Sequence, residues 1–489
     1  MKTSYLLQSF YKWFPIIFLL LVWYVPRQTA LGGWFEKYII LRWITLIIIP
    51  VWGGIQLLVN ILQRRKLNLT NIILPMSSFF LILVISCLIN RTSFSKMLGA
   101  SLLYLRYPAL FIILVNMDLP KDILYVFTRI FGTLLFLQIP ECLCRFIFLG
   151  VKGDDISWTL GRWGTMDLGV YSIYFTAILV AYGIIKKIKL FHFVFIGAFF
   201  MFALLGEIRA FYFAVFPVAL MVAIFEMRRY TKQKLVRASI VFFLILVFAT
   251  ITLKLWRIVY PQKYDFFATI VDKNKREEVI PKYFAQIVDL ERETQKSKIL
   301  AEEQTLILSK KSEGVRKKVV DRFLVFKKAL KKVGRIFRSI LYFRGMDRIR
   351  GIYDFFVVID PPLINKIFGM GPGSSFKGSF WKEKGKIYNY KVNAMNQMIG
   401  VLADTGLLGM AAFYWLLFNM LSVFIKVNNI LREENLRMFV PAVVGMWFFY
   451  GFIGTFYILV WRYDSPSFIY FFYSAMIYRL WYDSAIKST

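Results

Sequence analysis

Histidine, cysteine and acidic residues are scarce in this chain of 489 residues, and two of these shortages exclude whole classes of site. The single histidine, His192, excludes a metal site built from several histidine ligands. The three cysteines, Cys87, Cys142 and Cys144, lie in apolar stretches without zinc-ligand spacing or a disulfide framework, so we interpret them as small buried hydrophobic residues. The sequence therefore predicts neither a metal site nor a cofactor.

Apolar residues are abundant: 58% of the chain is hydrophobic and 18% is aromatic. A soluble globular protein cannot bury that much apolar surface, whereas a lipid bilayer can. The apolar run at 13–25 is followed by no small-residue cleavage site, so we expect a retained first helix rather than a removed signal peptide. The formal net charge of +33 is typical of nucleic-acid-binding proteins, but its meaning depends on where the basic residues lie along the chain.

Segments long enough to cross the hydrocarbon core of a bilayer recur along the chain. We predict them near residues 13–25, 38–62, 71–89, 97–116, 123–149, 167–185, 190–206, 208–226, 237–258, 396–425, 437–461 and 465–481. The predicted fold class is therefore an all-α polytopic membrane protein with about 12 transmembrane helices. About nine helices form an N-terminal bundle at 1–256, about three lie at 393–489, and a large, mainly helical hydrophilic insert at 257–392 separates them.

Basic residues are concentrated in alternate loops, and this asymmetry predicts the orientation. The richly basic loops contain Arg64, Arg65, Lys66, Lys121, Lys186, Lys187, Lys189, Arg228, Arg229, Lys232, Lys234, Arg237, Lys426, Arg432 and Arg437. The short loops between them carry far fewer basic residues. By the positive-inside rule, both termini lie in the cytoplasm and the insert at 257–392 lies on the outer face of a bacterial inner membrane.

The insert contains one basic amphipathic pattern, at 315–344. Apolar residues recur there at helical spacing, and lysines and arginines occupy the other face. Such a helix lies on an anionic membrane surface or packs as a solvated helix on the rest of the insert, and the sequence favours neither. Anionic lipids are thus a predicted partner, and nucleic acid is not, because the basic face lies outside the cell.

Three predicted spans run inward from the outer face with polar residues at their starts: 161–167, 206–209 and 393–397. Helix N-termini expose unpaired N–H groups and the positive end of the helix dipole, which favour anions such as phosphate. Structural alternatives remain open: Glu207 can pair with Arg209, and the side chain of Arg162 can reach the lipid headgroups.

The third of these spans carries a polar stripe. Asn393, Asn396, Gly400 and Asp404 recur at three- and four-residue intervals and thus share one helix face. The glycines of the following Gly-Leu-Leu-Gly run at 406–409 are explained by close helix packing. Packing does not explain Asp404, because an ionisable group at membrane depth is costly and usually functional.

These runs resemble elements of the O-antigen polymerase and O-antigen ligase superfamily. The run at 396–409 is similar to the signature that ends in an acidic residue and Gly-Leu-Leu-Gly, and 367–376 resembles a glycine-rich element. The run at 206–210 resembles a Ser-Arg element, and 161–166 resembles an element with arginine, glycine and threonine. All four follow the expected order over roughly residues 155–425.

The resemblance implies a GT-C-like, metal-independent glycosyltransferase that uses an undecaprenyl-diphosphate-linked oligosaccharide at the outer face. Arginines would bind the diphosphate leaving group, since a guanidinium stays charged and grips phosphate in a bidentate fork. Arg209 is the best candidate, Arg348 or Arg350 the second, and Arg162 a third. Substrate-binding roles are expected for Gly371, Asn393 and Asn396. Because Met395 stands where the ligases have a histidine, Asp404 or Glu207 would have to serve as the catalytic base, or the acceptor would attack without a strong base.

Two departures favour one branch of this superfamily. Met395 stands where the ligases have histidine, and Ile208 stands where the family has serine. We therefore expect a polymerase of lipid-linked polysaccharide repeat units, of O-antigen, capsule or exopolysaccharide type. The expected partners are a flippase and a chain-length regulator of the same pathway. The alternatives are a ligase that moves the glycan to a lipid A-core or protein acceptor, and a polysaccharide flippase or transporter.

Overall fold

The computed structural model is helical wherever it describes the chain. It describes residues 13–21, 39–62, 72–117, 119–120, 122–153, 156–157, 160, 164–229, 231–259, 355–356, 361–372, 374, 397–431, 433–457 and 464–486. No strand occurs within these ranges. The predicted all-α fold class is confirmed for this part of the chain.

The helices follow the predicted apolar segments within a few residues. A first helix covers residues 13–21. The others are α3 (Ile39–Leu62), α4 (Ile73–Ile89), α5 (Phe94–Val115), α6 (Ile123–Leu149), α7 (Gly164–Ile185), α8 (Leu190–Leu205), α9 (Arg209–Met227), α10 (Lys232–Val259), α15 (Leu363–Phe368), α16 (Gln397–Ile430), α17 (Glu434–Arg437), α18 (Phe439–Phe448), α19 (Gly454–Tyr457) and α20 (Asp464–Ile486). A π-helix at Phe449–Ile453 joins α18 to α19.

Six of the described helices are long and apolar enough to cross a membrane, and α5 makes a seventh if its two segments, bent by 47°, form one span. Two shorter apolar helices are also present: Ile73–Ile89 precedes these helices in sequence, and Leu190–Leu205 lies between α7 and α9. The protein is therefore a multi-pass α-helical membrane protein, and the total of about 12 spans stays a prediction.

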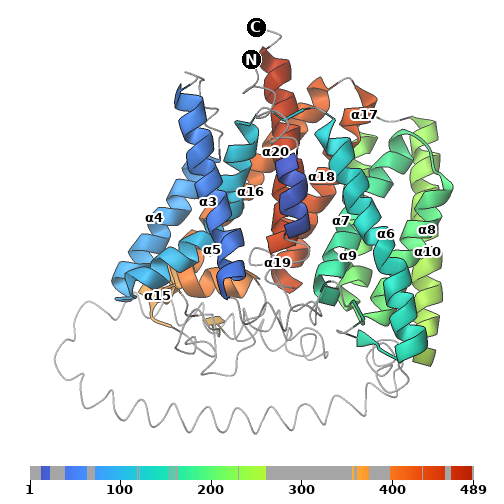
Figure 1. The fold of residues 1–489 in the computed structure, drawn as a ribbon, viewed down its shortest axis with the longest axis horizontal. Helices are drawn as coiled ribbons and strands as arrows, with labels where there is room; N and C mark the ends of the chain where they lie inside the picture. The colour runs from blue at the N-terminus through green and yellow to red at the C-terminus, as the bar shows by residue number, and fades with distance from the viewer. Residues whose placement is uncertain are drawn as a thin grey trace, which may run out of the picture. The chain divides into compact units, whose positions relative to one another are not determined.

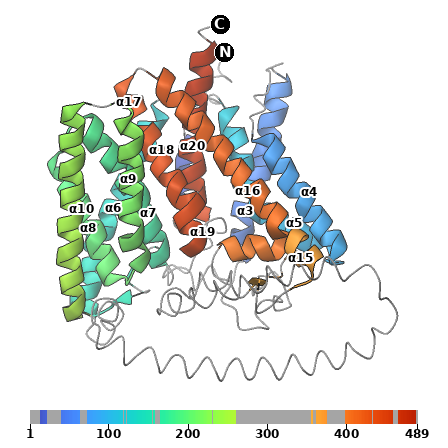
Figure 2. The same ribbon diagram turned by 180° about the vertical axis from the view of Figure 1, so that it is seen from behind.

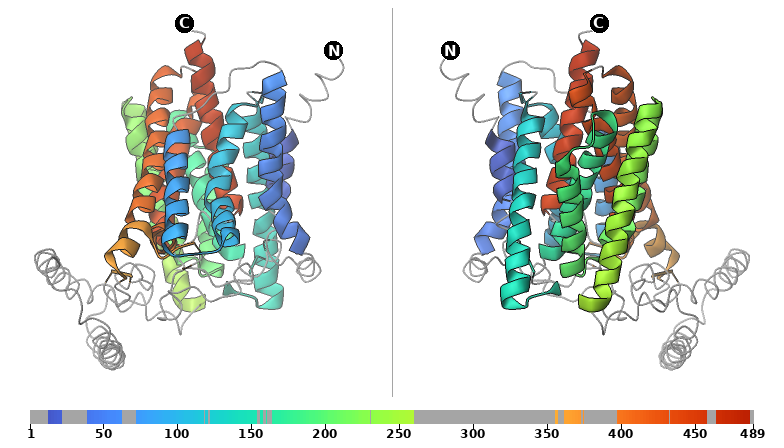
Figure 3. Two further views of the ribbon diagram at one scale, coloured as in Figure 1. Left: turned by 90° about the vertical axis from the view of Figure 1, so that its left-hand side faces the viewer. Right: turned by 90° about the vertical axis from the view of Figure 1, so that its right-hand side faces the viewer.

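The long helices lie side by side and cross the bundle, so that successive loops lie at alternate ends (Figures 1 and 3). We call one end the basic end, defined by residues 186–189, 228–234 and 426–437. The other is the site end, defined by residues 90–93, 150–153, 206–208 and 361–374. The sorting of loops between two ends agrees with the predicted alternation, and the assignment of the basic end to the cytoplasm remains a prediction of the positive-inside rule.

Buried charged groups fasten the helices together at the basic end. The carboxylate of Glu226 is paired with Lys234 and, at 2.7 Å, with Arg437, and all three side chains are largely buried. Arg229 donates to the backbone oxygen of Asn428 at 2.7 Å, which links the end of α9 to the end of α16. A buried charge is costly unless it is paired, and this one has two partners.

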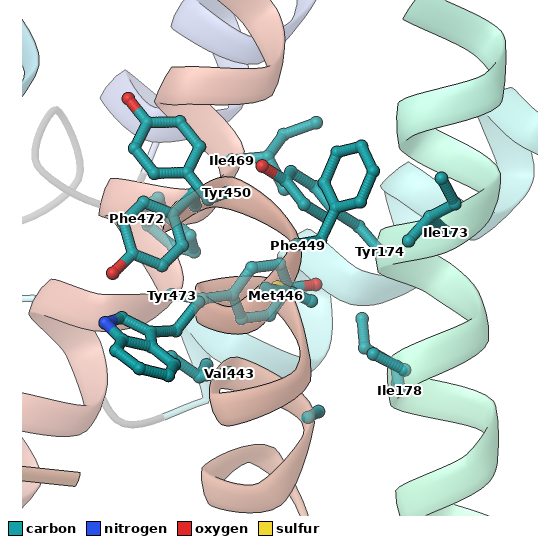
Figure 4. Packing of buried hydrophobic residues seen from close by; sticks show 14 of the residues in the cluster. Ile173, Tyr174, Ile178, Val443, Met446, Phe449, Tyr450, Ile469, Phe472 and Tyr473 are labelled. Carbon is teal, nitrogen blue, oxygen red and sulfur yellow. The ribbon is translucent and has the colours of Figure 1, made fainter. Parts of the chain in front are cut away.

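Aromatic residues fill the centre of the bundle between α7, α18 and α20 (Figure 4). Tyr450 stacks on Tyr470 with ring centroids 4.4 Å apart, and Tyr174 meets Phe449 edge-to-face at 5.8 Å. All four of these side chains are fully buried. Aromatic pairs of this geometry contribute about 0.5–1.5 kcal/mol each beyond the burial of their area.

The chain divides into two compact units, residues 1–255 with 355–489, and residues 256–354. The predicted insert at 257–392 lies mostly outside the described residues, as does its predicted amphipathic helix at 315–344. Of the insert, residues 257–259, 355–356, 361–372 and 374 are described, and α15 at Leu363–Phe368 packs on α4 and α16 of the first unit. This short segment is thus part of the helix bundle.

Candidate functional site at one end of the helix bundle

Two of the motif elements meet in a small pocket at the site end. The first turn of α7 contributes Thr165 and Met166, and the turn between α8 and α9 contributes Gly206 and Glu207. Phe449, the first residue of the π-helix, lines the same pocket. The pocket has a volume of about 50 Å³ and lies beside the N-termini of two helices, α7 and α9. Their unpaired N–H groups favour an anion there.

The turn between α8 and α9 holds Glu207 in a left-handed conformation, with φ 54°. The N–H of Ile208 bonds to the carbonyl of Ala203 at 2.9 Å, and that of Gly206 bonds to Phe202 at 2.8 Å. This is the pattern of a helix end at which the left-handed residue is usually glycine. A glutamate there costs about 1 kcal/mol, and strain of this kind gathers at functional sites.

Packing explains the isoleucine at the next position. Ile208 is only 7% exposed, and a Cβ placed on Gly169 of α7 would lie 2.5 Å from Ile208 Cγ2. The side chain therefore fills the close contact between the turn and α7. Arg209 follows as the first residue of α9. Arg162 lies outside the described residues.

The other two motif elements interlock through their backbones. α16 is broken at Gly406, which has φ 67° and ψ −163°. Gly369 also has a positive φ, 85°, and a Cβ placed there would lie 2.5 Å from the backbone nitrogen of Thr405. The N–H of Met370 donates to the carbonyl of Ala403 at 2.6 Å. We call this interlocked region, residues 367–374 with 403–406, the glycine clasp.

The clasp refines one sequence-based interpretation. Close helix packing is found at Gly406, where a Cβ would collide with the backbone oxygen of Ile367 in α15, but Gly406 also interrupts α16, which the sequence did not indicate. Gly409 faces Thr405 of its own chain segment. The span predicted to continue through Asp404 therefore changes direction directly after it. Only glycine combines a positive φ with such a close backbone approach.

Asp404 is fully buried at the centre of the clasp. Its Oδ2 accepts a hydrogen bond from the hydroxyl of Tyr104 on α5 at 2.8 Å, and its Oδ1 accepts one from Ser374 at 3.2 Å. Its backbone oxygen accepts a third, from Ser86 on α4, also at 2.8 Å. A buried carboxylate needs such donors, and here they join the clasp to two further helices.

Sequence reasoning did not find the residues that hold the clasp from α4. The amide of Asn90 donates to the carbonyl of Gly369 at 3.0 Å, and the amide of Asn365 donates to Asn90 Oδ1 at 2.7 Å. Gly371 lies so close to this helix end that a Cβ on it would be 2.9 Å from Asn90 Cβ. These residues are far apart in the chain, and an isolated asparagine at a predicted helix end gives no signal of its partner.

Arg106 is a second residue that the sequence-based reasoning missed. It lies in the apolar helix α5, is only 5% exposed, and its guanidinium lies 4.8 Å from the centroid of the Tyr107 ring. An arginine inside an apolar span is a recognisable signal of a polar interior. Arg106 is two positions from Tyr104, so α5 carries both a buried cation and a donor to Asp404.

The structure brings the predicted residues together in two groups rather than one. Glu207 and the turn that leads to Arg209 lie beside α7, whereas Asp404 and Gly371 belong to the clasp on α4, α5 and α15. In Figures 1 and 2, α15 and the start of α16 lie on the opposite side of the bundle from α7 and α9, at the same end. The predicted residues that lie outside the described part are Arg162, Arg348, Arg350, Asn393, Met395 and Asn396.

The hydrogen bond between Tyr104 and Asp404 yields a first testable prediction. Replacing Tyr104 with phenylalanine removes a donor to a buried carboxylate, so we expect the free energy of unfolding to fall by about 1.5–3 kcal/mol. The measurement is the thermal midpoint of the full-length protein purified in detergent. Tyr174→Phe is the matched control, because within the described residues its fully buried hydroxyl has no hydrogen-bond partner. Equal midpoints for the two variants would contradict the role assigned to Tyr104.

The geometry defines a multi-pass helical membrane protein. At one end it has a pocket between two helix N-termini, a buried carboxylate at Asp404 and a strained glutamate at Glu207. Within the described residues, no three histidine, cysteine, aspartate or glutamate side chains gather as metal ligands would. No family model matches the chain, and no curated protein matches it either. The function is therefore inferred from the residues and their geometry.

Proposed function

We propose that the protein polymerises lipid-linked polysaccharide repeat units at the outer face of the bacterial inner membrane. The donor is a glycan on undecaprenyl diphosphate, and the acceptor is the next lipid-linked repeat unit. The acceptor hydroxyl attacks the anomeric carbon of the donor and loses its proton, while the bond from that carbon to the diphosphate oxygen breaks. Undecaprenyl diphosphate leaves with both electrons of that bond.

One observation carries the proposal: the pocket between the start of α7 and the turn into α9. Two of the motif elements line it, and so do residues from the first turns of α7 and α9, where the positive ends of the two helix dipoles lie. Arg209 begins one of those helices, and we assign to it the positive charge that would stabilise the diphosphate as the glycosidic bond breaks. Arg162, Arg348 and Arg350 remain candidates for a second cation.

The two carboxylates suit different tasks. Glu207 is partly exposed and lines the pocket, so it is the candidate base for the acceptor hydroxyl. Such help typically contributes about 10²–10⁴-fold to the rate. Asp404 is fully buried and hydrogen-bonded within the clasp, and we assign it a positioning role there. The clasp fixes the start of α16, next to Asn393 and Asn396, which the resemblance assigns to glycan binding.

The proposal is tested by supplying the purified protein with a lipid-linked oligosaccharide and nothing else. A ladder of product lengths on gel electrophoresis is the expected result. No reaction until a separate lipid A-core or protein acceptor is added would instead identify a ligase. Absence of transfer under both conditions, with movement of the lipid-linked glycan across a vesicle membrane, would replace the proposal with a transporter.

A further inference from the structure

An apolar groove lies between α9 and α10 at the basic end, away from the site end. Leu220, Ala223 and Ile224 form one wall, and Leu235, Ala238, Ser239 and Phe242 form the other. Its volume, about 720 Å³, is within the range of about 300–1,000 Å³ usual for pockets that hold small molecules. One charged residue, Arg228, lines it at the end of the bundle where the basic loops lie.

The groove follows from how α10 packs. Figure 2 draws α10 at one edge of the helix bundle. The helix is held from the side of α7 and α8: a Cβ on Gly197 of α8 would lie 3.0 Å from the ring of Phe248, and a Cβ on Gly183 of α7 would lie 3.3 Å from Val241. The Glu226–Lys234 pair joins α9 to α10 at the basic end, and the groove lies between the apolar side chains of these two helices.

Some basic side chains near the end of the groove are paired with groups of the protein, and one, Arg228, is exposed to the surroundings. Lys234 and Arg437 pair with Glu226, and Arg237 donates to the backbone oxygen of Ile185 at 3.0 Å. Arg228 is exposed, and its guanidinium lies 5.1 Å from the centroid of the Phe225 ring. The local charge is therefore positive, and its most accessible member lies at the end of an apolar groove.

We propose that this groove is a binding site for an anionic phospholipid, with an acyl chain between α9 and α10 and the phosphate at Arg228. The membrane supplies such lipids at high local concentration. Apolar walls half exposed at Leu220 and Ile224 match a hydrocarbon chain, and a guanidinium binds an anionic headgroup more strongly than a zwitterionic one, whose ammonium offsets the phosphate charge. The site is independent of the proposed transfer reaction and would act on the packing of α10 against α9.

The test measures lipid binding to the full-length protein by native mass spectrometry, with phosphatidylglycerol and phosphatidylethanolamine as the two probes. Arg228→Gln is expected to weaken binding of phosphatidylglycerol about fivefold and to weaken binding of phosphatidylethanolamine by less, because its ammonium already offsets the phosphate charge. Lys187→Gln is the matched control: it removes an exposed charge at the same end of the bundle, outside the groove.

A second pair of variants tests the apolar part. Ser239→Trp fills the groove from an exposed position and is expected to weaken binding of both lipids about fivefold or more. Val236→Trp is the matched control, because it adds the same ring to the same helix at a residue that is 57% exposed and outside the groove. This variant should bind both lipids as tightly as the unmodified protein does. Leu220→Trp fills the groove from the opposite wall if Ser239→Trp does not fold.

Two results would overturn the proposal. If Arg228→Gln retains full preference for phosphatidylglycerol, Arg228 does not bind the phosphate. If the groove-filling variants bind both lipids as tightly as Val236→Trp does, the acyl chain lies elsewhere. Selective loss with Arg228→Gln and general loss with a filled groove would together support it.

Discussion

Replacing Arg209 with alanine is expected to reduce glycan transfer by about 10²–10³-fold, the usual effect of removing one group that stabilises developing charge in a transition state. Arg209 begins α9 beside the pocket between α7 and α9, and a diphosphate leaving group gains charge as the glycosidic bond breaks. The measurement is the initial rate with a lipid-linked oligosaccharide, together with the amount of protein in the membrane.

Two variants separate charge from geometry and from general effects. Arg209→Lys keeps the positive charge but loses the planar fork, so we expect a smaller loss than with alanine. Lys254→Ala removes an exposed charge from α10, outside the pocket, and should keep normal activity. Full activity of Arg209→Ala at a normal protein level would refute the diphosphate clamp.

The second large effect is structural. Gly406→Ala is expected to lower the free energy of unfolding by about 3 kcal/mol or more, because it adds left-handed strain to a collision with the clasp backbone. The new Cβ would meet the backbone oxygen of Ile367 and lie 2.5 Å from the backbone nitrogen of Gly369. Neither group is a flexible side chain that can move aside. The measurement is the thermal midpoint in detergent and the yield of monodisperse protein.

Two other glycines serve as controls that separate the left-handed backbone strain from the collision with the clasp backbone. Gly150 has φ 61° but nothing within 4 Å of a new Cβ, so Gly150→Ala should show only the backbone strain, about 1–2 kcal/mol. Gly54 lies within α3 with open space around it, so alanine there should be tolerated or slightly stabilising. If Gly406→Ala were no worse than Gly150→Ala, the close backbone approach would not matter for stability.

Local patterns in the sequence predicted the helices well. Apolar runs of membrane length mark α4, α6, α9 and α16 within a few residues of their observed bounds, because burial in lipid requires continuous apolar sequence and closed backbone hydrogen bonds. The alternation of basic loops also matches the two ends of the bundle. The candidate site was found only in part: the turn at 206–209 and the run through Asp404 were both identified, but as members of one group.

The sequence by itself determined that this is a multi-pass helical membrane protein over the residues that the structure describes, where its long apolar helices lie to within about five residues, and which loops carry the positive charge. Each of these depends on neighbouring residues along the chain. The tertiary structure alone decided that Gly406 breaks α16, that Asp404 is held by Tyr104 and Ser374, and that an apolar groove lies between α9 and α10. Those features depend on contacts between segments up to hundreds of residues apart, and no local periodicity encodes such a contact. The structure also shows that Arg228, in one of the basic loops that predicted the orientation, lines the apolar groove between α9 and α10.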